Sequence, residues 1–184
     1  IDVLAPMAAK GLAKVYLSVT TLDGTLARRM EPRASTPRKR LDAVKQLNAA
    51  GIPTGVMVAP IIPSLNDHEI EKILEEAKAV KATEANYIFL RLPLELKDLF
   101  REWLQDHYPG RLNHVLGLVK DAHGGVDYRP RFGERMRGEG VYAALIAQRF
   151  KVACERLGLN QERQRVRTDL FKVPPKAGDQ MSLF

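Results

Sequence analysis

Several polar side chains lie at or just beyond the ends of predicted β-strands, where they could bind a ligand or take part in catalysis. Ser18 and Thr20 have the same parity on a predicted strand, so they share a face and could bind a ribose or a carboxylate, or be satisfied core hydroxyls. Glu31 and Arg33 stand two residues apart in the following loop. They could clamp the ammonium and carboxylate of an amino acid, pair with each other, or pair with neighbouring basic residues. Arg91 lies at the end of a third predicted strand and is costly to bury without a partner.

Metal-ligating residues are few. The single cysteine, Cys154, excludes a disulfide framework, a cysteine-built zinc site and an iron–sulfur cluster held by three or four thiolates of this chain. Cys154 belongs to the apolar stripe of a predicted helix, which favours a buried thiol. The four histidines have no metal-ligand spacing, and no Walker or Rossmann glycine loop is present. We therefore expect no metal site in this chain.

The chain is basic, and its arginines are clustered. Its 184 residues contain 29 Lys and Arg against 22 Asp and Glu, a formal net charge of +7. Such clusters either hold phosphates or form solvated salt-bridge networks. The sequence predicts possible DNA contacts, carried by Arg28, Arg29, Arg129, Arg131, Arg135 and Arg137.

Targeting and membrane signals are missing from the sequence. No apolar run approaches the length of a bilayer span, and no signal-peptide pattern is present, so we expect a cytoplasmic protein without a membrane partner. The chain opens on Ile1 and Asp2 rather than Met, which favours a piece of a longer protein.

Hydrophobic periodicity predicts three consecutive βα units, which indicates an α/β fold. Strands are expected at 14–19, 52–59 and 85–92, and helices at 35–50, 66–80 and 95–107. Thr36 or Ser35 would cap the first helix, and Asn66 with Glu69 would form a capping box for the second. Two further helices are predicted at 111–121 and 139–157. Strands alternating with amphipathic helices imply a parallel sheet, here half of a βα barrel.

We divide the chain into three parts. Residues 1–108 hold the three βα units, residues 109–159 form a helical extension with a basic glycine-rich loop, and residues 160–184 form a flexible tail.

Several runs resemble the radical S-adenosylmethionine (SAM) enzymes, most closely the spore-photoproduct-lyase-like group, also described as DNA repair photolyase-like. The resemblance rests on seven segments: residues 18–23, 30–34, 49–53, 55–63, 62–70, 91–95 and 131–140. It implies half of a partial (β/α)6 barrel, with SAM and a [4Fe–4S] cluster as the cofactors of the full-length protein. The three-cysteine CxxxCxxC loop of that family is absent here, so this chain alone is expected to be inactive.

The resemblance also implies a function and a set of cofactor-binding residues. The function is lyase or repair-type radical chemistry on nucleic acid. Two alternatives remain: a non-catalytic module that tethers to nucleic acid or a sliding clamp, and a radical SAM enzyme acting on a protein or small molecule. No catalytic residue is assigned. The residues expected to face SAM or substrate are Ser18, Thr20, Glu31, Arg33, Val58, Pro60 and Arg91.

The last five residues, from Gln180 to Phe184, resemble the pentapeptide by which bacterial repair and replication proteins bind the β sliding clamp. Gln180 would provide a polar anchor, and Leu183 and Phe184 would fill an apolar pocket. The alternatives are an accidental tail sequence and a local packing hook.

Overall fold

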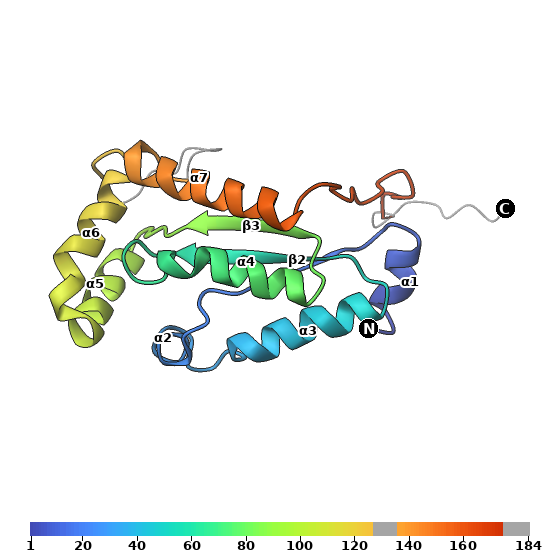
Figure 1. The fold of residues 1–184 in the computed structure, drawn as a ribbon, viewed down its shortest axis with the longest axis horizontal. Helices are drawn as coiled ribbons and strands as arrows, with labels where there is room; N and C mark the ends of the chain where they lie inside the picture. The colour runs from blue at the N-terminus through green and yellow to red at the C-terminus, as the bar shows by residue number, and fades with distance from the viewer. Residues whose placement is uncertain (127–135, 175–184) are drawn as a thin grey trace.

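A three-stranded parallel sheet in the order β1-β2-β3 forms the centre of the molecule (Figure 1). In this computed structural model, residues 1–126 and 136–174 are described. The strands are β1 (Val15–Ser18), β2 (Thr54–Ile61) and β3 (Glu84–Phe89). The α/β fold and the parallel sheet are therefore confirmed, and three parallel strands joined by helices are consistent with a partial barrel.

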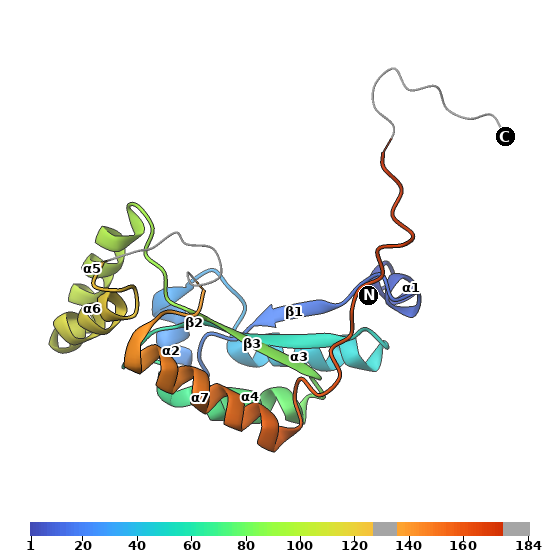
Figure 2. The ribbon, with the colours of Figure 1, turned by 90° about the horizontal axis from the view of Figure 1, so that it is seen from above.

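Three helices cover one face of the sheet, because their apolar stripes pack on the side chains of that face (Figure 2). These helices are α3 (Pro37–Ala49), α4 (Ile70–Ala79) and α7 (Gly140–Leu157). Val44, Ile73 and Ile146 are fully buried between the helices and the sheet. On the opposite face, Met57, Asn86 and other side chains are only half-buried.

The helix boundaries follow the local signals. Thr36 caps α3 by accepting a hydrogen bond from the Lys39 amide at 3.4 Å, and Pro37 occupies the first turn. Gly51, just after α3, has φ +74°, and Gly158, after α7, has φ +63°. This left-handed conformation strains a residue with a Cβ atom, so glycine ends both helices.

Three features differ from the sequence-based prediction. Two short helices, α1 (Leu4–Ala9) and α2 (Gly24–Met30), were not predicted. The predicted Asn66–Glu69 capping box does not form, because both side chains bond elsewhere. Pro60 does not end β2 but lies within it, after a cis Ala59–Pro60 peptide bond.

Beyond the carboxyl ends of the strands, a smaller lobe packs around a second apolar core (Figure 1). It contains α5 (Leu96–His107) and α6 (Leu112–Asp121), whose Leu104, Val115 and Val119 are buried. The two remaining short helices are the 3-10 turns η1 (Asp67–Glu69) and η2 (Pro109–Arg111). Among the described residues, no helix is both long and apolar enough to cross a membrane.

Candidate functional site

The carboxyl ends of β1 and β2 are joined by one buried amide side chain. Asn66 is 2% exposed, and its Nδ2 donates to the carbonyl oxygens of Thr20 at 2.7 Å and Pro60 at 2.9 Å. Its Oδ1 accepts from the Ile62 amide at 2.7 Å. Three backbone groups from two loops are therefore held by a single residue, which fixes the relative position of the two strand ends.

The loop after β1 is fixed by a second set of contacts. Glu69 accepts hydrogen bonds from the Thr21 hydroxyl and from the Leu22 amide, the latter at 3.2 Å. The Thr21 hydroxyl oxygen in turn accepts from the Asp23 amide at 3.0 Å. Asp23 caps α2 by accepting from the Thr25 amide at 2.7 Å. Each polar side chain of this loop thus has a backbone partner that sets its direction.

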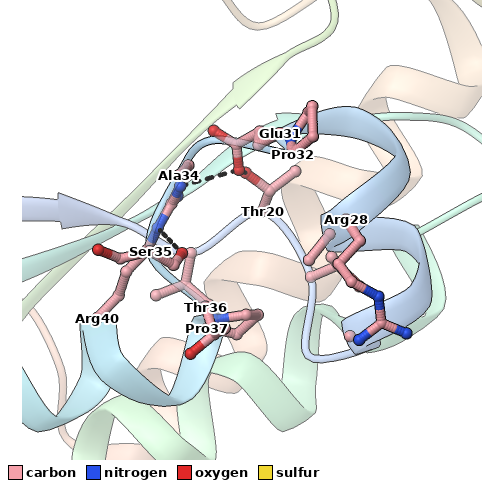
Figure 3. A pocket seen from close by; sticks show the side chains of 13 residues that line it. Thr20, Arg28, Glu31, Pro32, Ala34, Ser35, Thr36, Pro37 and Arg40 are labelled. Atoms are coloured by element: carbon pink, nitrogen blue, oxygen red, sulfur yellow. Dashed lines mark hydrogen bonds and ion pairs between the residues drawn. The ribbon is translucent and has the colours of Figure 1, made fainter.

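A pocket of about 280 Å³ opens between this loop, α2 and the start of α3 (Figure 3). The Thr20 hydroxyl donates to the Ala59 carbonyl oxygen at 2.9 Å and lies 3.4 Å from Glu31 Oε2. Arg40 Nη2 lies 3.0 Å from the same carboxylate oxygen. Figure 3 shows Thr20 beside Glu31, and Arg28 across the pocket from Ser35. The pocket therefore combines a hydroxyl, a carboxylate and guanidinium groups.

Arg40 connects the pocket to β1, an edge strand of the sheet. Besides Glu31, it donates to the Ser18 carbonyl oxygen through Nη1 and to the Ser35 carbonyl oxygen through Nε, both at 3.0 Å. The Glu31 side chain is 38% exposed, whereas that of Arg40 is 15% exposed. Of the alternatives for Glu31, the geometry thus favours pairing with the basic cluster over a clamp formed with Arg33.

The structure brings only part of the predicted cofactor set together. Thr20 and Glu31 line the pocket, but Ser18, Arg33, Val58, Pro60 and Arg91 do not. Ser18 and Arg33 are exposed, and Arg91 is partly exposed rather than buried. Val58 lies in the main core, and the carbonyl group of Pro60 is bound to Asn66.

Sequence reasoning missed Arg40, Asn66 and Glu69 as parts of the site. A sequence signal for Arg40 did exist. It lies four residues before Val44, which is fully buried, so both residues face the sheet side of α3. Asn66 and Glu69 matched a local capping pattern, and only the three-dimensional approach of the β1 and β2 loops reveals their actual partners.

The amino end of the sheet carries a different polar network. Tyr16, Gly55 and Glu84 are in register across the three strands, and the Tyr16 ring crosses the glycine to hydrogen-bond Glu84. Lys14 Nζ donates to both carboxylate oxygens of Glu84, at 3.0 and 3.1 Å. The Gln164 amide donates to the same carboxylate at 3.2 Å.

Burial and charge shift the pKa values of this network in opposite directions. Burial raises the pKa of Glu84, but hydrogen bonds from Tyr16 and Lys14 outweigh it and leave the pKa below its ordinary value. Burial and the neighbouring carboxylate raise the pKa of Tyr16. The network therefore keeps Glu84 charged and Tyr16 protonated at neutral pH.

The six arginines predicted to contact nucleic acid fall into three sets: two on α2, one beside β3, and three outside the described residues. Arg28 and Arg29 are exposed; Arg28 lines the pocket, and the guanidinium of Arg29 lies over the Tyr108 ring. Arg137 lies at the edge of β3, where its guanidinium stacks 4.1 Å from the centre of the Tyr87 ring and donates to Asn86. Arg129, Arg131 and Arg135 lie outside the described residues. The clamp-like residues Gln180, Leu183 and Phe184 lie outside them as well.

The residues of this chain do not fit an iron–sulfur cluster. Within residues 1–126 and 136–174, no three His, Cys, Asp or Glu side chains converge to hold a metal ion. Cys154 is buried, as predicted, and burial raises the pKa of its thiol to about 11. A thiol that remains protonated in an apolar site is a poor metal ligand.

Comparison with known proteins supports the family resemblance. Residues 1–77 match the model of the Radical SAM superfamily. An uncharacterized protein of Methanocaldococcus jannaschii is 33% identical over 96 residues, which cover 52% of this chain and 35% of that protein. One from Mycobacterium tuberculosis is 30% identical over 150 residues, covering 80% of this chain and 43% of that protein. No solved structure matches this chain.

The matched segment contains β1, β2 and the loops that form the pocket, which suggests a radical SAM enzyme-related function. Full-length members of that superfamily use SAM and a [4Fe–4S] cluster. The chain spans less than half the length of these two relatives.

Proposed function

We propose that this chain is the carboxyl-terminal part of a radical SAM enzyme and forms one wall of its reaction chamber. The observation that carries the proposal is the convergence of Thr20, Glu31, Arg40 and Asn66 at the carboxyl ends of β1 and β2, within the segment that matches the superfamily. In parallel βα structures, ligands bind at the carboxyl ends of the strands.

The chain's own residues would orient a ligand and shield it from water. Thr20 and Asn66 hold the two strand ends together, and the Glu31–Arg40 pair presents a carboxylate at the pocket. The cluster requires ligands from outside this chain, since the residues here do not fit one.

The proposed substrate is nucleic acid, processed by lyase or repair-type chemistry. Support comes from the resemblance stated above and from the basic charge of +7. Exposed Arg28, which lines the pocket, and its exposed neighbour Arg29 would attract a polyanion. A protein or small-molecule substrate is the alternative, in which case the basic surface serves another role.

The test uses the product of the whole reading frame that encodes this chain. After anaerobic reconstitution with iron and sulfide, it should cleave SAM and release 5′-deoxyadenosine. Glu31→Gln should lower that rate without changing the absorbance of the cluster, because Glu31 lines the pocket. Glu76→Gln on α4 is the matched control, because Glu76 is also half-buried and paired with a cation, Lys72. Absence of 5′-deoxyadenosine from the reconstituted wild type would overturn the proposal.

We further propose that the end of the chain binds a bacterial sliding clamp. The segment before it is anchored at the amino end of the sheet, where the Arg167 amide donates to the Gly11 carbonyl oxygen at 2.8 Å. Beyond this anchor, Leu170, Phe171 and Val173 are 51–74% exposed. A peptide of residues 175–184 should bind purified clamp, and replacing Leu183 and Phe184 by alanine should abolish binding. Equal binding of both peptides would refute the proposal.

A further inference from the structure

The corner formed by α2 and the first turn of α3 carries the most concentrated positive charge in the described part of the chain. Residues 23–42 contain six Arg and Lys residues against three carboxylates. Two of those carboxylates are engaged, because Asp23 caps α2 and Glu31 pairs with Arg40. The segment therefore has a net charge of +3, and two of its cations, Arg28 and Arg40, line the pocket.

Five of the six cations of this segment have no carboxylate partner among the described residues. Arg29 lies against the Tyr108 ring instead. The other four, Arg28, Arg33, Arg38 and Lys39, are exposed, and we call them the cationic corner. Grouped unpaired cations favour a partner that carries several negative charges at once.

A row of aromatic rings continues this surface onto α5. Trp103 stacks on Phe100, with ring centres 5.6 Å apart and an interplanar angle of 14°. The centre of the Tyr108 ring lies 5.5 Å from that of Trp103. All three side chains are half-buried, so each ring retains an accessible part. We call Phe100, Trp103 and Tyr108 the aromatic row.

Arg29 joins the two parts of the surface. Its guanidinium carbon lies 5.3 Å from the centre of the Tyr108 ring, and its carbonyl oxygen accepts a hydrogen bond from Trp103 Nε1 at 2.9 Å. The aromatic row is thereby held against the end of α2. Of the acidic residues of α5, Asp98 and Glu102 are not three or four residues from Trp103, whereas Asp106 is three residues after it and lies near the same face of the helix.

We infer that the cationic corner and the aromatic row together form a binding surface for single-stranded nucleic acid, an inference that rests on the nucleic-acid substrate proposed above. A single strand offers negatively charged phosphates and unpaired bases. The phosphates would contact the cations, and the bases would stack on the aromatic rings. In a duplex the bases are paired and stacked on each other, so they are not available to stack on the aromatic row. Arg28 belongs both to the cationic corner and to the lining of the pocket, so a bound strand would lie next to the pocket that Thr20 and Glu31 also line.

The test measures binding of a fluorescent oligothymidylate of about 20 nucleotides by anisotropy over a range of salt concentrations. The variant Arg28→Gln, Arg38→Gln, Lys39→Gln should bind at least about tenfold more weakly at low salt. Its plot of log affinity against log salt should be shallower by about 2, at roughly 0.7 per phosphate contact. The control Lys72→Gln, Lys151→Gln, Arg165→Gln removes the same charge elsewhere on the surface and should bind nearly as tightly as the wild type.

Trp103 provides a second readout without any substitution. It is the one tryptophan of the chain, so its emission reports on the aromatic row alone. We expect saturating oligothymidylate to quench it, because a stacked base contacts the indole ring. Unchanged emission at saturation would overturn the inference.

Other outcomes also decide against this surface. Equal weakening in the control variant would assign the binding to overall charge, and equal affinity for a duplex or an acidic peptide would remove the single-strand assignment. None of these results depends on SAM cleavage. Failure of the 5′-deoxyadenosine assay would therefore leave this surface standing, and failure of the surface would leave radical chemistry standing.

Discussion

The two ends of the parallel sheet are held together by different kinds of interaction. At the amino end, a buried carboxylate, Glu84, is surrounded by Lys14, Tyr16 and the Gln164 amide. At the carboxyl end, a neutral amide, Asn66, joins β1 to β2, and the charged pair of Glu31 and Arg40 lies at the rim of a pocket. The charged group is therefore buried at the amino end, which we call the closed end. It is partly exposed at the carboxyl end, which we call the open end.

This difference separates stability from ligand binding. A buried, fully bonded carboxylate has no capacity left for a ligand, whereas a partly exposed ion pair can exchange partners at little cost. We expect substitutions at the amino end to affect the free energy of unfolding. Charge changes at the carboxyl end should affect binding instead. Asn66 is the exception, because it is the structural element of the open end.

The largest effect is expected for Asn66→Ala. The change leaves the Ile62 amide and the carbonyl oxygens of Thr20 and Pro60 without their partner in a buried position. We expect the free energy of unfolding to fall by about 3 kcal/mol, since each unsatisfied buried group costs about 1–3 kcal/mol and water can reach some of them. Urea denaturation measures the loss. A change below about 1 kcal/mol would show that the strand ends do not depend on Asn66.

Gly55→Ala should have the next largest effect. A Cβ atom at this position would lie 2.2 Å from the Tyr16 ring, which must then move and release Glu84. We expect a loss of about 2 kcal/mol, within the range for overpacking. Gly117→Ala is the matched control, because a Cβ atom there meets nothing within 4 Å in the middle of α6. That control should be stabilising by about 0.5–1 kcal/mol.

Much of this architecture could be predicted from sequence, because it depends on local patterns. Apolar periodicity located all three strands and the five longest helices, and Thr36, Gly51 and Gly158 marked helix ends. Such signals depend on residues within one turn of each other.

The candidate site was less predictable because its contacts join distant segments. Glu84 meets Tyr16 across 68 positions, and Asn66 meets Thr20 across 46. A glutamate in a strand and an asparagine before a helix each fit a local explanation. Only the register of the sheet shows that Gly55 leaves space for Tyr16 to reach Glu84. Thr20 and Glu31 were found because strand-end position alone is informative in parallel sheets.

Glu84→Gln tests the charge of the closed end. Glutamine retains the shape and one acceptor but loses the ion pair with Lys14, so we expect the free energy of unfolding to fall by about 1–2 kcal/mol at pH 7. Urea denaturation at neutral pH measures this difference. A variant as stable as the wild type would show that the buried pair contributes no net stability.

The same variant should alter the response to acid. The pKa of Glu84 is lower in the folded than in the unfolded protein. The ionised carboxylate therefore contributes its full stabilisation of the fold above the ordinary glutamate pKa of about 4.3, and this stabilisation is lost as the pH falls through the pKa of the folded state. Glu84→Gln should therefore lose less stability than the wild type between about pH 4.5 and pH 3. Some acid sensitivity should remain, because a hydrogen bond from Arg149 also lowers the pKa of Glu71. An unchanged pH dependence would contradict the assignment.

The smallest effect on stability is expected for Glu31→Gln, the corresponding change at the open end. The Glu31 side chain is 38% exposed, and Arg40 retains its bonds to the carbonyl oxygens of Ser18 and Ser35. Exposed pairs contribute little, so the free energy of unfolding should change by less than about 0.5 kcal/mol in urea denaturation. A loss as large as that of Glu84→Gln would show that both ends use charge for stability. A small loss, combined with slower release of 5′-deoxyadenosine, would instead confine the role of Glu31 to the pocket, because the sheet keeps its stability when this charge is removed.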